Sequence, residues 1–176
     1  MKVDGKNMRP IWFDESSQVV QAIDQRFLPH KLIIKNLNNV DDTIHAIKEM
    51  VVRGAPLIGA SGALGVFISL VQENNKGADN DYLVSECNRL KDARPTAINL
   101  VWGVDRVLST ALKYQNYDRR VKAALDEALV IVEEEAVNCE KIGAYGMPII
   151  EEISKQKNGG PVNILTHCNA GWLACI

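Results

Sequence analysis

One uncharged stretch, residues 55–71, reads APLIGASGALGVFISLV, and it decides the fold that we expect. Its length is close to the minimum for crossing a bilayer, which takes about 20 apolar residues. Small residues recur three positions apart, at Gly59, Gly62 and Gly65, and this spacing lets two helices approach closely in a protein core. We therefore expect a buried central helix over residues 56–73 and no membrane span.

The chain on either side of this stretch has its own periodicity. Apolar residues with helical spacing predict further helices, and Asp41 or Asp42 is the expected N-cap of the first one. Pro95 suits the first turn of a helix. Short β-like stretches come before all of them and predict a small antiparallel sheet. The expected helices are 41–51, 80–92, 95–114 and 118–140, and the expected strands are 9–14, 18–23 and 31–35.

The C-terminal residues follow a different pattern. Residues 162–166 read VNILT after a glycine and proline turn, and they predict a short buried strand followed by a loop and the opening of a helix. A lone parallel strand cannot satisfy its backbone groups, so we expect partner strands outside this chain and interpret the chain as part of a longer protein. The alternative is a helix-rich domain with an apolar tail.

These patterns give an α/β protein in three parts. Residues 1–40 form a small antiparallel β cap, and residues 41–120 form a helical N-terminal domain. Residues 121–176 form a linker helix and the first strand of an incomplete parallel sheet. This organisation places the β structure at the two ends of the chain and the helices between them.

Composition excludes several classes of protein. The 176 residues are 47% apolar and carry a net charge of −2, which fits a soluble globular chain and gives no general attraction for nucleic acid or an anionic membrane. The four cysteines form no C-x-x-C pair and no apolar leader precedes them, so we expect free thiols in the cytoplasm. His167, Cys168 and Cys175 lack the usual spacing of zinc ligands, and we expect no metal.

Two arginines stand where an anion could bind. Arg53 precedes Gly54, Ala55 and a proline that opens the central helix, and unpaired amides at a helix N-terminus attract phosphate. Arg94 stands directly before Pro95 in the same way. A solvated arginine in a helix-linking turn is the alternative at each place.

Cys168 is the candidate reactive group. It follows the expected strand, where open α/β sheets place their ligands, and it precedes a helix N-terminus, which favours a thiolate. His167 would project to the opposite face of that strand, so we do not expect it to act as the base. An inert thiol remains the alternative.

Three motifs occur in order along the chain: VRGAPLIG at residues 52–59, RPTAINL at residues 94–100 and LTHCNAG at residues 165–171. Together with DQRFLP at residues 24–29 and NCEKIGAYG at residues 138–146, this set resembles the methylthioribose-1-phosphate isomerase family. The superfamily includes ribose-1,5-bisphosphate isomerases and the regulatory subunits of translation initiation factor 2B. The resemblance covers the whole chain.

The resemblance implies a fold, an activity and a site. It implies a helical domain joined to a Rossmann-like domain in a homodimer, of which this chain is the N-terminal half. Arg53, Arg94 and the amides near Gly54 and Ala55 would hold the phosphate of a sugar 1-phosphate, and Cys168 would be the catalytic thiol. Its partner, an aspartate of the Rossmann-like domain, is not in this chain. The implied reaction is the aldose–ketose isomerisation of methionine salvage, and it needs no metal or organic cofactor.

Two alternatives and two departures accompany this resemblance. A non-catalytic regulatory subunit of initiation factor 2B type, or a ribose-1,5-bisphosphate isomerase, would share these motifs. Trp172 stands where we expect a small residue, and a bulky indole there would narrow the pocket. Cys175 stands where the family commonly has threonine and adds a second thiol near Cys168.

Overall fold

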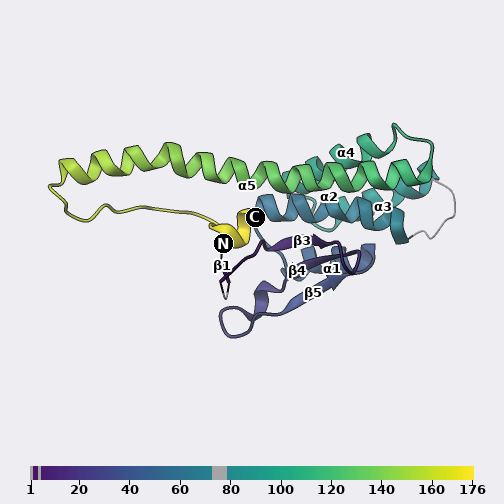
Figure 1. Cartoon of the computed structure of the whole chain (residues 1–176), viewed down its shortest axis with the longest axis horizontal. Coiled ribbons are helices and arrows are strands. Elements are labelled where there is room, and N and C mark those ends of the chain that lie inside the picture. Colours follow the sequence, from purple (N-terminus) through teal and green to yellow (C-terminus); the bar gives the residue numbers. More distant parts are fainter. Residues whose placement is uncertain (1, 4, 73–78) are drawn as a thin grey trace.

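Helix α2, Ala55–Gln72, lies at the centre of the molecule, and every residue from Leu57 to Leu70 is buried (Figure 1). The computed structural model describes residues 2–3, 5–72 and 79–176, so residue 73 of the expected central helix lies outside them. In length and composition α2 could cross a membrane, but 78% of it is buried inside the protein. It is the core helix that the uncharged stretch predicts. The helices packed against it are α1 (Val40–Lys48), α3 (Asn80–Asp92), α4 (Ile98–Ala111), the first part of α5 (Tyr117–Gln156) and the short α6 (Trp172–Cys175).

The expected antiparallel cap is confirmed, but its third strand covers Ile34–Leu37 rather than residues 31–35. Strands β3 (Ile11–Asp14), β4 (Val19–Ile23) and β5 (Ile34–Leu37) form one sheet with β4 in the middle. The short strands β1 (Lys2–Val3) and β2 (Lys6–Asn7) pair separately, and a 3₁₀ turn, η1, covers Gln25–Phe27. The rings of Phe13 in β3 and Phe67 in α2 pack edge to face, with their centroids 5.4 Å apart. This aromatic contact packs the sheet against the core helix.

Capping and turn residues explain two differences between the observed and the expected helix starts. The N-cap of α1 is Asn39, whose side chain accepts a hydrogen bond from the Asp42 amide, so Asp41 and Asp42 lie in the first turn instead. Helix α4 begins at Ile98 rather than at residue 95. The Ala97 amide bonds the Arg94 carbonyl at 2.9 Å, which closes a turn with Pro95 at the position where proline is favoured.

Helix α5 continues to Gln156, well past the expected end at residue 140. Its C-terminal half extends beyond the rest of the helices (Figure 1). Most residues there are exposed, so no amphipathic stripe marks the continuation, and Gly143, Gly146 and Pro148 resemble an ending. The prediction was wrong because it depended on a buried face that this half of the helix does not have.

The expected buried strand over residues 162–166 does not form. After α5 the chain runs back alongside the helix toward the helical body without regular structure, and only one turn, α6 (Trp172–Cys175), follows (Figure 1). Leu165 is 98% exposed. In the described part of the chain no strand pairs with this segment, and a strand cannot be buried without neighbours.

Candidate functional site

Glycines at the crossing of α2 and α4 let the two helix backbones approach closely. A Cβ atom on Gly103 of α4 would collide with the backbone oxygen of Gly59 on α2, and a Cβ on Gly59 would lie 2.8 Å from the carbonyl oxygen of Asn99. The two backbones therefore touch directly, as small residues allow. This contact lies near the start of both helices and brings their N-termini side by side.

Gly54 is the last residue of the loop before α2, and its position has room only for glycine. Its φ is +109°, and a Cβ there would lie 2.6 Å from the Cα atom of Ala174 in α6. Its carbonyl accepts the first hydrogen bond of the helix from Ile58, at 2.9 Å. Gly54 thus places the first turn of α2 in contact with the C-terminal end of the chain, which no larger residue would permit.

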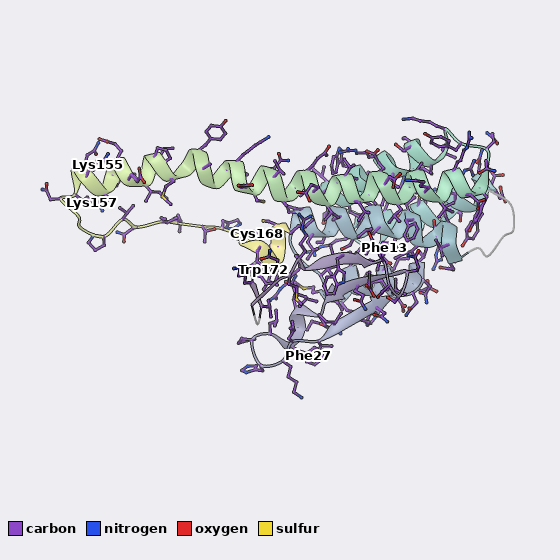
Figure 2. The ribbon with its side chains drawn as sticks, in the orientation of Figure 1. Phe13, Phe27, Lys155, Lys157, Cys168 and Trp172 are labelled. Carbon is purple, nitrogen blue, oxygen red and sulfur yellow. The ribbon has the colours of Figure 1, made fainter. Side chains whose placement is uncertain are left out.

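Cys168 approaches the same place from the other side. Its φ is +63°, a left-handed conformation that a residue with a Cβ seldom adopts, and its side chain is exposed. The turn α6 begins four residues later, after Gly171 at φ +86°. Figure 2 shows Cys168 near Trp172, where the returning segment reaches the helical body, far from Lys157 beside the tip of α5.

These segments enclose a hollow of about 180 Å³. Four of the five residues predicted from the sequence line it: Gly54, Ala55, Arg94 and Cys168. The volume is below the range of about 300–1,000 Å³ for a complete drug-sized site, so it suits one part of a ligand. The remaining lining residues are Ile58, Thr96, Ala97 and Asn169.

Arg94 is the charged side chain of this hollow. Among residues 2–3, 5–72 and 79–176 the ion pairs join other side chains, and no carboxylate neutralises Arg94. The first turn of α2 lies opposite, with the positive end of the helix dipole. An unpaired guanidinium beside a helix N-terminus favours binding of an anion such as phosphate.

Two other residues lie differently from the sequence expectations. Arg53 is half-buried and precedes Gly54, but it does not line the hollow. Trp172 does not narrow the hollow, because it lines a separate cavity with Cys139 and Cys175.

Three polar residues were missed by sequence reasoning. Thr96 and Asn169 add a hydroxyl and an amide to the hollow, next to Pro95 and Cys168 within motifs that were recognised. Gln25 is buried, and its side-chain amide donates a hydrogen bond to the Leu173 carbonyl of α6. The DQRFLP motif that contains Gln25 was the available signal, but one sequence cannot connect it to a turn 148 residues away.

An ion pair fixes the start of the turn that carries Gln25. Arg26 bonds both carboxylate oxygens of Asp24, at 2.9 and 2.7 Å. This pairing holds the pKa of Asp24 below its ordinary value. The described residues contain no group of three or more His, Cys, Asp or Glu side chains that could hold a metal ion.

Comparison with known proteins identifies the family. The profile of the Initiation factor 2 subunit family matches residues 51–175, and this chain belongs to that family. A methylthioribose-1-phosphate isomerase of Desulfosudis oleivorans is 53% identical over 168 residues, which cover 96% of this chain and 46% of that protein. The chain therefore spans about half the length of the curated relatives it matches.

Solved structures of the family have the same fold. The 5-methylthioribose 1-phosphate isomerase of Pyrococcus horikoshii OT3 is similar with a TM-score of 0.76 and 30% identity, over 96% of this chain and 46% of that one. The delta subunit of translation initiation factor eIF-2B from A. fulgidus is similar with a TM-score of 0.70 and 34% identity, over 74% and 38%.

Proposed function

We propose that this chain provides the phosphate-binding and thiol part of an aldose–ketose isomerase. The proposed substrate is 5-methylthioribose 1-phosphate and the product is 5-methylthioribulose 1-phosphate. The observation that supports it most directly is one hollow lined by Arg94, by Gly54 and Ala55 at the start of α2, and by Cys168. A relative 53% identical to this chain is named as an isomerase of this substrate.

The phosphate would lie between Arg94 and the first turn of α2. The guanidinium supplies paired donors in a planar fork, and the helix end supplies amides and positive potential. Arg53 precedes Gly54, so its charge adds positive potential at the same place although its side chain does not line the hollow. In a sugar 1-phosphate C1 carries the phosphate and C2 is bonded to C1, so both carbons stay close to the bound phosphate.

The reaction requires a hydrogen shift between those two carbons. The bond from C1 to the ring oxygen breaks, the ring oxygen gains a proton, the hydroxyl on C2 loses one, and the hydrogen on C2 moves to C1. Cys168 lines the hollow beside the phosphate seat and is the group proposed to assist the hydrogen shift, whether it passes as a proton or as a hydride. A carboxylic acid outside this chain would protonate the ring oxygen.

The complete site needs more than the residues of this chain. The isomerase relatives are about twice as long as the part that matches, and we propose that residues 162–176 lead into a Rossmann-like domain that supplies the second wall. With neighbouring strands present, the exposed side chains of Ile164 and Leu165 would become buried. A cytoplasmic homodimer belongs to the same proposal.

A regulatory subunit of initiation factor 2B type is the second candidate. The similarity to the delta subunit of eIF-2B from A. fulgidus, at a TM-score of 0.70, favours it. Such a subunit would use the hollow to bind a phosphorylated ligand without turnover. The position of Cys168 favours the isomerase, because binding a phosphate requires no thiol.

The test is a chimera in which this chain replaces the matching part of the Desulfosudis oleivorans isomerase. It should convert 5-methylthioribose 1-phosphate in preference to ribose 1,5-bisphosphate. Cys168→Ala should lower kcat by about 10²–10⁴-fold without weakening substrate binding, because it removes a group that acts on a proton or hydrogen. His167→Ala, next to it and outside the hollow, is the control. Full turnover by Cys168→Ala would contradict the mechanism, and a folded chimera without turnover would favour the regulatory reading.

Arg94→Ala tests the proposed phosphate-binding site separately from the role of Cys168. Hydrogen bonds to charged groups contribute about 1.5–3 kcal/mol, so substrate affinity should fall roughly 10- to 100-fold. Arg119→Ala, an exposed arginine on α5, is the matched control. Calorimetric titration of each folded chimera with substrate measures the difference. An unchanged dissociation constant for Arg94→Ala would remove the proposed role.

A further inference from the structure

A second cluster of reactive groups lies behind the hollow, where α6 meets α5. The thiol of Cys139 on α5 is directed at the backbone carbonyl of Cys175 on α6, with sulfur and oxygen 3.9 Å apart. Both cysteines are half-buried and both are free thiols. They line a cavity of about 320 Å³ together with Ile142 and Trp172. Neither thiol belongs to the site described above.

The chemical environment of Cys175 shows that the two side chains interact. Burial raises the pKa of Cys175, and the adjacent Cys139 thiol raises it further through charge and a hydrogen bond. Two thiols that interact across different elements are candidates for a disulfide, which requires Cα atoms within about 7 Å of each other. Both cysteines line the cavity, whose volume of about 320 Å³ can admit part of a small disulfide.

The turn that carries Cys175 is also part of the wall of the phosphate site. Ala174 packs against Gly54, where a Cβ would lie 2.6 Å from its Cα atom. The Leu173 carbonyl accepts the hydrogen bond of Gln25. Cys168 lies just before α6 in the chain. A covalent link at Cys175 would therefore hold the residues that position both sides of the hollow.

We propose that Cys139 and Cys175 form a redox-modifiable dithiol, which a low-molecular-weight disulfide converts into an intramolecular disulfide that locks α6 to α5. One protein thiolate attacks the small disulfide, forms a mixed disulfide and releases one small thiol. The second protein thiolate attacks the protein sulfur of that mixed disulfide and releases the other small thiol. The protein pair loses two electrons and two protons, and the small disulfide is reduced to two thiols. This inference is independent of the reaction at the hollow.

Oxidised glutathione tests the proposal on the folded chain. The Cys168→Ser variant removes the exposed competing thiol, and it is treated with glutathione buffers of increasing oxidised fraction. Non-reducing digestion and mass spectrometry should find one crosslinked product that joins the peptides of Cys139 and Cys175 and is lighter by two hydrogens. Cys139→Ser and Cys175→Ser in the same background should carry glutathione on the remaining thiol without a crosslink.

Hydrogen exchange distinguishes a disulfide that restrains α6 from one that forms without any effect on the turn. Amides of residues 172–176 should exchange about tenfold more slowly in the oxidised chain, because a crosslink suppresses local opening of the turn. Glutathione on either cysteine without a crosslink in the folded chain would overturn the proposal. So would a crosslink that forms only in urea, or one that leaves the exchange of residues 172–176 unchanged.

Discussion

Helix α2 and the C-terminal half of α5 are both rich in apolar side chains, but only α2 buries them. Every residue of α2 from Leu57 to Leu70 is buried, whereas Ile142, Ile149 and Tyr145 of α5 are 71%, 64% and 79% exposed. Helices α1, α3, α4, α6 and the near half of α5 pack against α2. Figure 1 shows that the far half of α5 extends beyond α1, α2, α3 and α4. Apolar sequence therefore predicts burial only where the same chain supplies a partner.

Glycines sharpen the contrast between these two regions. In α2 they let neighbouring elements approach, and a Cβ on Gly62 or Gly65 would meet side chains of Leu100 or Leu90 closer than 3.0 Å. A Cβ on Gly143 or Gly146 of α5 would meet nothing within 4 Å. Glycine is thus required for packing in α2, whereas in the far half of α5 it only lowers the stability of the helix.

The largest expected difference comes from truncating one apolar side chain in each region. Leu64→Ala, at a fully buried position of α2, should lower the free energy of unfolding by about 2–5 kcal/mol because it leaves a cavity. Ile149→Ala on α5 should change it by less than about 0.5 kcal/mol. Urea unfolding followed by circular dichroism measures both. Equal losses would show that the far half of α5 is packed in solution.

A smaller difference in stability comes from adding one methyl group at a glycine in each region. The two changes should have opposite signs. Gly103→Ala forces the backbones of α2 and α4 apart and should destabilise the chain by about 1–3 kcal/mol. Gly143→Ala meets no atom and should stabilise α5 by about 0.5–1 kcal/mol, since alanine loses less backbone freedom. The shifts of the thermal midpoints should have opposite signs. Stabilisation by Gly103→Ala would refute the close helix contact.

The sequence predicts the parts of the fold whose partners are local. The central helix, the antiparallel cap and the start of α3 after Asp79 follow from periodicity and capping. The strand over residues 162–166 fails because pairing depends on neighbours that local pattern cannot supply. Trp102 of α4 is 41% exposed although its neighbours in sequence are apolar, and the guanidinium of Arg106 lies over its ring.

The sequence could predict which residues belong to the candidate site, but not how they are arranged in space. Arg94, Gly54 and Cys168 were singled out by their neighbours in sequence, and the structure brings them round one hollow. Their roles stay predictions. The contribution of Gln25 could not be predicted, because a side chain reaching a carbonyl on a distant turn leaves no periodic trace in one sequence. Arg53 does not line this hollow, because adjacency to Gly54 does not determine the direction of a long side chain, and its role in phosphate binding stays a prediction.

The smallest expected effect concerns what attaches the first half of α5 to the helical body. Arg106 of α4 bonds Glu127 at 2.6 Å and also pairs with Glu134, and no such network holds the far half among the described residues. Arg106 keeps the pKa of Glu134 below its ordinary value of 4.5. The resulting stability is complete above pH 4.5 and is lost as the pH falls through the lowered pKa.

Arg106→Gln should therefore cost under about 1 kcal/mol near pH 7, because the carboxylate of Glu134 is half-exposed and screened by solvent. It should cost progressively less as the pH falls below 4.5, where the wild-type chain loses the pair between Arg106 and Glu134. Urea midpoints at several pH values, with Arg119→Gln as the exposed control on α5, measure the convergence. A penalty that stays constant down to low pH would mean that Arg106 acts by packing over Trp102 rather than by charge, and that the near half of α5 is held by apolar contact alone.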